Sequence, residues 1–184
     1  MPLIDHLRRM AWNNAWSNHR LLEACGRLSE DAYRAKRVSF FPSIHLTLNH
    51  ILIVDWYYID AIEGGGLGPR AYADEAPCAT FAALEAAQRA SDRRLIALVE
   101  GISEQELERV VNLDRGEAGL KPEAVASVLG HLYVHQIHHR GQVHAMLAGT
   151  EVPPPQLDEF FLDQDAHLRA GEMAALRARG YGGT

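Results

Sequence analysis

Histidine is the residue type in this chain whose number and spacing point most directly to chemistry. Ten of the 184 residues are histidines, and four of them lie between His131 and His139. Neutral imidazole is a common metal ligand, and histidine also titrates near neutral pH. A cluster of histidines therefore indicates a metal site, and the alternative is a set of hydrogen-bonded core residues.

Two histidine pairs in this segment have the spacing of neighbours on one helical face. Residues four apart on a helix lie one above the other, and His135 has this relation to both His131 and His139. At about 100° per residue, His138 points roughly 60° away from His135, and His144 points to the opposite side. His135 is therefore the best candidate ligand, while His131 and His139 are both candidates for the second position.

A third ligand is expected from a second helix that is apolar on nearly every side. This helix is predicted over residues 43–63, with Ser43 as its N-cap, and it carries His45 and His50. Buried polar groups need partners, so these two histidines are conspicuous in such a helix. They lie about 140° apart on its surface, so only one is expected to face the other histidines. Because the helix is apolar all round, its periodicity does not choose between them.

The residues next to the histidines argue against two known kinds of metal enzyme. In a zinc protease of the H-E-x-x-H type, a glutamate beside the first ligand is the base, but Gln136 stands there and does not take up a proton. The chain also lacks the pair of Glu-x-x-His motifs that characterises di-iron carboxylate bundles. A site built mainly from histidines remains, with open positions for water or substrate.

The elements expected to position these residues are helices. Apolar residues recur at intervals of three and four over residues 3–28, 43–63, 80–100 and 122–148. One short strand is predicted at residues 108–113, one or two short helices at 156–179, and a flexible end at 180–184. The predicted fold class is all-α: a single domain over residues 1–184, in which four long helices form a bundle and short C-terminal helices cover it.

Composition narrows the class of protein further. The formal net charge is −6 and the pI is about 5.9, which disfavours nucleic-acid binding. Cys25 and Cys78 lack metal-site spacing and are predicted to be small buried or half-buried residues. No secretory signal and no apolar run of 18 residues is visible, so no membrane association is expected and the predicted location is the cytoplasm.

Four stretches of this sequence resemble the DinB-like (damage-inducible, YfiT-like) family of bacterial proteins. They occur in order along most of the chain, and the His-Arg-Gly-Gln segment is the most specific of them: residues 12–18, 39–52, 135–142 and 155–162. The resemblance implies an up-down-down-up four-helix bundle, often dimeric, that holds one divalent metal ion. The family ligands correspond to His50, His135 and His139 in this sequence.

The resemblance also implies a range of functions without selecting one. Zinc and nickel are both expected metals, and relatives include thiol-dependent S-transferases and an isomerase that uses a low-molecular-weight thiol. The leading hypothesis is a metal-dependent transferase or hydrolase acting on a small molecule, and the alternative is a non-catalytic metal or small-molecule binding protein of the stress response. A homodimer is expected because the helices carry abundant apolar surface, including Trp12, Trp16 and Trp56.

Overall fold

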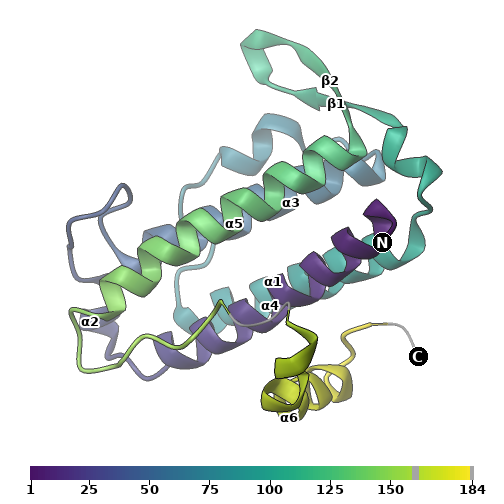
Figure 1. Ribbon diagram of the computed structural model, residues 1–184. Coiled ribbons are helices and arrows are strands. Elements are labelled where there is room, and N and C mark those ends of the chain that lie inside the picture. Colours follow the sequence, from purple (N-terminus) through teal and green to yellow (C-terminus); the bar gives the residue numbers. More distant parts are fainter. Residues whose placement is uncertain (159–161, 183–184) are drawn as a thin grey trace.

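The computed structural model describes residues 1–158 and 162–182 and is mostly helical (Figure 1). Its described residues form six α-helices and one small antiparallel sheet, together with four short 3₁₀ turns. The α-helices and strands are α1 (Leu3–Cys25), α2 (Glu30–Arg34), α3 (Ile44–Glu63), α4 (Phe81–Gly101), β1 (Val110–Asp114), β2 (Leu120–Ala124), α5 (Val125–Leu147) and α6 (Ala166–Ala178).

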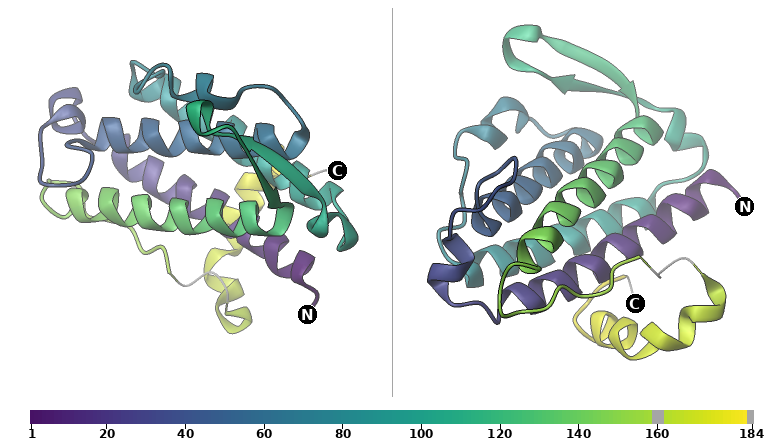
Figure 2. Two further views of the ribbon diagram at one scale, coloured as in Figure 1. Left: turned by 90° about the horizontal axis from the view of Figure 1, so that it is seen from above. Right: turned by 60° about the vertical axis from the view of Figure 1, so that its left-hand side comes forward.

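The four long helices α1, α3, α4 and α5 lie side by side (Figures 1 and 2). They contribute most of the buried hydrophobic residues of the core. α3 packs against α4 and α5, and α1 packs against the same two helices. As its composition predicts, α3 is buried on most sides. The Ser43 side chain accepts a hydrogen bond from the Leu46 amide, which confirms the predicted N-cap, and Gly64 ends α3 in the left-handed conformation at φ 80°.

The structure corrects the prediction for the start of the last long helix. Residues 120–124 form β2, which pairs with β1, and α5 begins only at Val125. Pro122, which was expected in the first turn of the helix, instead lies opposite Asn112 in the hairpin. A proline has no amide hydrogen to donate, and a two-stranded sheet consists only of edge strands, where this is tolerated. The predicted strand itself is confirmed, two residues later at its start.

Two further segments differ from expectation. The linker after α1 contains the short helix α2, whose N-cap Ser29 accepts from the Ala32 amide. The C-terminal end was expected to be flexible, but Tyr181 is buried and lies under the Arg93 guanidinium, 5.4 Å from its ring centroid. Residues 159–161 and 183–184 of the predicted tail lie outside the described residues. The expected short C-terminal helix is present as α6, which packs on α1 (Figure 2).

Both cysteines are buried, as predicted. Among the helices in the described ranges, none combines the length and the hydropathy needed to cross a bilayer.

Candidate metal centre

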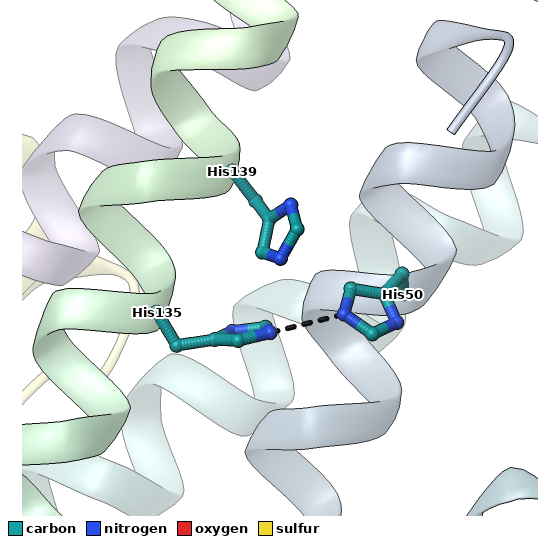
Figure 3. Close-up of side chains that lie close together, drawn as sticks. All are labelled: His50, His135 and His139. Carbon is teal, nitrogen blue, oxygen red and sulfur yellow. Dashed lines mark hydrogen bonds between the residues drawn. The ribbon is translucent and has the colours of Figure 1, made fainter. Parts of the chain in front are cut away.

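Three histidines from α3 and α5 converge at the contact between these two helices. His50 comes from α3, and His135 and His139 come from successive turns of α5; their rings point toward one another (Figure 3). The Nε2 atoms of His50 and His135 are 3.0 Å apart, and one ring nitrogen from each of the three residues lies within 4.8 Å of the others. The structure thus brings together three histidines positioned to bind a metal ion.

The spacing of these nitrogens fits one transition-metal ion. Zinc–nitrogen bonds of about 2.0–2.1 Å at tetrahedral angles place two ligand nitrogens about 3.4 Å apart. The His50–His135 distance of 3.0 Å is close to this value, and all three nitrogens lie within 4.8 Å of one another, so small side-chain rotations bring the rings into position. Imidazole rings that face one another can share at most a few protons, whereas a cation accepts every lone pair. The donor set therefore fits a metal ion better than it fits a self-contained hydrogen-bond network.

The surroundings keep these histidines in the unprotonated form that metals require. Burial, and secondarily the charge of His139, lowers the pKa of His50 to about 4. Burial and the neighbouring histidines lower the pKa of His135 to about 3. Burial also lowers the pKa of His139, and the hydrogen bond that His139 donates to Gln142 opposes this shift. At neutral pH all three imidazoles are neutral, as metal ligands must be.

Gln142 holds His139 in place from the far side of its ring. The His139 Nδ1–H donates to the Gln142 carbonyl oxygen at 2.8 Å, an assignment that leaves Nε2 free to bind a cation. The Gln142 amide in turn donates to His138 Nε2 at 3.1 Å. Sequence reasoning missed Gln142, although its spacing of three from a candidate ligand was a usable signal. His138 therefore contacts the site only through Gln142 and is not one of the three clustered histidines.

Phe41 also shapes the site and was not predicted as part of it. Its ring centroid lies 4.2 Å from that of His50 and 5.6 Å from that of His139. The apolar ring shields one side of the cluster from water. The third histidine differs from His139 in its outer nitrogen: His135 Nδ1 is buried and has no hydrogen-bond partner among residues 1–158 and 162–182.

The two histidines that competed for ligand positions lie elsewhere. His45 is buried at the start of α3, where its backbone oxygen accepts from the Asn49 amide and its ring packs edge-on against Tyr33. His131 is exposed, with its ring 5.2 Å from that of Tyr58 and 6.3 Å from that of His135. Tertiary packing, which periodicity alone did not reveal, makes this selection.

A second buried polar cluster, which we call the core network, is formed by side chains of α1, α3, α4 and α5. Its acids are Asp55 and Asp92, and its only cation is Arg140; four amides connect them: Asn14, Asn18, Gln88 and Gln136. Burial raises the pKa of Asp55 to about 6 and that of Asp92 to about 7, where the charge of Asp55 adds to the effect. Gln136, which replaces the protease glutamate, donates to Asp55 here. It is a structural neighbour of the ligands and not a base.

A cavity of about 350 Å³ gives access to the histidine cluster from the side of α3. It is bordered by His50 and by mostly apolar neighbours, with Glu75 as its one carboxylate: Phe41, Pro42, Leu46, Ile53, Tyr72 and Glu75. A small molecule with an apolar part fits such a cavity and reaches one of the three histidines.

The fold and the site together define a helical protein with a three-histidine cluster between two core helices. Residues 4–170 match the model of the DinB family, and the chain belongs to this family. Protein DinB of Bacillus subtilis (strain 168) is 26% identical over 140 residues, which cover 73% of this chain and 80% of that protein.

Two solved structures have a similar fold. A DinB-like protein from Bacillus cereus ATCC 10987 has a TM-score of 0.60 at 13% identity, over 77% of this chain and 90% of that chain. A DinB-like protein from Bacillus subtilis has a TM-score of 0.57 at 18% identity, over 78% of this chain and 95% of that chain. At these identities the likeness concerns the fold and not the chemistry.

Proposed function

We propose that this chain binds one divalent metal ion through His50, His135 and His139, and that it is a metal-dependent enzyme acting on a small thiol and an electrophilic partner. Zinc and nickel are the metals we expect, because both bind neutral imidazole well. The observation that carries the proposal is the convergence of three ring nitrogens within 4.8 Å at a buried helix contact.

The number of protein ligands favours catalysis over a structural role. Structural zinc sites are closed by four protein ligands, whereas three ligands leave a position for water or substrate. A divalent ion at such a site supplies Lewis acidity and lowers the pKa of a bound water or thiol. The chain's own contribution is to hold the three imidazoles neutral, to orient His139 through Gln142 and to limit water access with Phe41.

The 350 Å³ cavity beside His50 supports a small substrate with an apolar part. Leu46 and Ile53 supply apolar surface there, and Glu75 supplies a carboxylate near the entrance. A low-molecular-weight thiol that carries an amine suits this combination, because the amine pairs with Glu75 while the thiol reaches the histidine side of the cavity.

We further propose that the long helices form an up-down-down-up four-helix bundle. α1 runs opposite to α4, since the Ile4 amide at the start of α1 donates to Glu104, just beyond the end of α4. Contacts with α5 pair residues of α1 in ascending order and residues of α3 in descending order: Leu7–Tyr133, Asn14–Arg140, His50–His139 and Tyr58–His131. These directions support the bundle topology, and a single domain over residues 1–184 is part of the same proposal.

We also propose a cytoplasmic homodimer. Of the tryptophans that first suggested it, Trp16 is buried within its own chain and donates to Glu172 of α6, so its apolar surface is already covered. The exposed α5 residues Val134 and Ile137, which are 66% and 52% exposed, supply a better candidate surface. Sedimentation at micromolar concentration tests this proposal, and a species of only 20.4 kDa contradicts it.

A turnover assay tests the catalytic part of the proposal. Protein loaded with zinc or with nickel is mixed with a small thiol such as cysteamine and a chromogenic electrophile such as 1-chloro-2,4-dinitrobenzene. We expect thioether formation above the background rate, lost both on chelation and in His139→Ala protein. If loaded protein of full metal content never exceeds the background over a panel of thiols and electrophiles, the non-catalytic binding function replaces the enzyme hypothesis.

A further inference from the structure

A second cavity, of about 470 Å³, lies on the side of α5 that faces away from the histidine cluster. Arg140 follows His135 by five residues, which places it about 140° further round the helix. The cavity lies between α1, α5 and the segment at residues 156–158, and its walls within the helices are Asn13, Ser17, Ile137, Arg140, Gly141 and His144. A cavity of this size accommodates a small organic ligand.

Arg140 is the unusual residue in this cavity. It is only 4% exposed, yet it makes no ion pair shorter than 4 Å with any acid of the described residues. Its three hydrogen bonds all leave from Nη1, toward the amide oxygens of Asn14, Asn18 and Gln136. The Nε and Nη2 atoms have no partner within the described ranges. A buried cation without a direct counterion is costly, and this edge of the guanidinium is the one that pairs with a carboxylate through two parallel bonds.

Two further polar groups of the cavity are available for hydrogen bonds to a ligand. The Asn13 amide and the Ser17 hydroxyl make no hydrogen bond within residues 1–158 and 162–182, although both residues are buried. Ile137 and Leu157 supply apolar surface in the same cavity. His144 fixes the outer wall, because its Nε2 lies 3.1 Å from the Pro155 carbonyl oxygen and donates to it. The cavity thus combines donors near Arg140 with apolar walls.

We propose that this cavity is a second binding site, separate from the histidine cluster, for a small organic monocarboxylate with an apolar body. The carboxylate accepts from Nε and Nη2 of Arg140, and the body packs on Ile137 and Leu157. Asp158 is an exposed residue of the cavity wall and accepts a hydrogen bond from the Gln156 amide. The acids of the core network are buried near Arg140 and accept hydrogen bonds from amide side chains. These negative charges disfavour polyanions and so select ligands with a single negative charge.

Binding of 3-phenylpropionate to the full-length, metal-loaded protein tests the proposal. The uncharged analogue 3-phenylpropanamide has the same shape without the charge. We expect saturable binding of the acid by calorimetry, and roughly ten- to a hundredfold weaker binding of the amide, because it loses the charge-assisted pair. Amide resonances of Asn13 and Ser17 are expected to shift on titration with the acid.

A matched pair of variants tests the location. Gly141 lines the cavity and a Cβ there meets no atom within 4 Å, so Gly141→Leu adds a side chain to the cavity wall without a Cβ clash. Gly130 lies on the same helix outside the cavity and has equally open surroundings, so Gly130→Leu is the control. We expect binding at least tenfold weaker in Gly141→Leu and unchanged in Gly130→Leu. Both folds are checked by circular dichroism.

Arg140→Lys keeps the positive charge but lacks the parallel Nε–H and Nη2–H donors. We expect this variant to bind the acid at least tenfold more weakly. Three results overturn the proposal: no saturable binding of the acid at millimolar concentration, equal binding of acid and amide, or undiminished binding in folded Gly141→Leu protein. The last result places the acid at another site of the molecule.

Discussion

The molecule contains two buried clusters of polar side chains, and α5 contributes to both of them. In the core network three amides accept from Arg140 and donate to an acid, so that Arg140 and Asp92 are connected through Asn18, for example. The fourth amide, Gln88, donates to both acids. In the histidine cluster the ring nitrogens point at one another, and His135 Nδ1 has no partner in the described part of the chain. Within the described residues, most polar atoms of the network pair with one another, apart from Asp92 Oδ2 and the Nε–Nη2 edge of Arg140. For the histidine cluster we propose instead that a cation supplies the missing partner.

The two clusters are also expected to respond to pH in opposite directions. The pKa values of His50 and His135 lie below that of free histidine, so their contribution to stability is present above about pH 6.5 and is lost as the pH falls toward 4. The pKa values of Asp55 and Asp92 are raised instead. Their contribution is present at low pH and is lost as the pH rises from about 4 to 7.

The largest effect is expected from breaking the core network at its only cation. Arg140→Ala removes three hydrogen bonds from a charged donor and leaves three buried amide oxygens without it, which costs roughly 3–5 kcal/mol of unfolding free energy. Urea denaturation measures this loss. The surface variant Arg94→Ala, which removes an exposed pair with Glu63, is the control and is expected to cost less than about 1 kcal/mol. Equal losses in both variants contradict the role given to the network.

Removal of the metal is expected to have the next largest effect, on the histidine cluster alone. At a free metal concentration of about 100 times Kd, binding adds about 2.7 kcal/mol, which raises the melting temperature by roughly 5–10 °C at pH 8. Because only unprotonated imidazole binds a cation, and the pKa values of His50 and His135 are about 4 and about 3 in the fold, this gap closes as the pH falls toward 4. Melting curves with and without a strong chelator measure it. If metal-loaded protein shows no gap at pH 8, the ion lies on the surface and not between α3 and α5.

Gln142 allows a finer test of the same cluster. In Gln142→Leu the His139 Nδ1–H loses its acceptor, and metal affinity is expected to fall roughly ten- to a hundredfold. Gln142→Glu keeps an acceptor at the same place and is expected to retain the affinity. Competition with a metal indicator of known Kd measures both variants. An unchanged Kd in the leucine variant removes Gln142 from the site.

The smallest effect concerns the pH dependence of the core network in metal-free protein. With its pKa raised to about 7, Asp92 keeps its proton in the fold while the unfolded chain has lost it, so stability falls by roughly 1.4 kcal/mol per pH unit between about pH 4 and 7. Asp92→Asn removes this slope and leaves the slopes that Asp55 and the histidines contribute. Urea denaturation at several pH values measures the difference. Identical slopes in parent and variant contradict a protonated Asp92.

The histidine cluster was largely predictable, and the core network was not. The i,i+4 spacing identified His135, and the resemblance to the DinB-like family supplied the choice of His50 and His139. Periodicity could not make that choice, because it depends on which faces of α3 and α5 meet. The network joins Arg140 to residues more than a hundred positions away in α1, and such contacts leave no local pattern.

For the secondary structure, too, local features were predictable and tertiary ones were not. The long helices were predicted close to their observed bounds because their apolar periodicity is local, and the Ser43 cap is a local signal too. β2 was missed because a proline near the start of an apolar helical pattern also suits a first helical turn. Only pairing with β1 decides the conformation of Pro122, and pairing is a tertiary property. The burial of Tyr181 was missed for the same reason, because its glycine-rich neighbours predict a flexible end and its packing partners are distant in the sequence.

The central claim is that His50, His135 and His139 hold one metal ion, and metal content of purified protein tests it most directly. Elemental analysis of the parent and of the three single alanine variants, together with His131→Ala as a matched histidine control, gives the stoichiometry. We predict one divalent ion per chain in the parent and in His131→Ala, and a large loss in each of the other three variants. Full occupancy in folded His135→Ala protein, or loss of the ion in His131→Ala alone, contradicts the assignment.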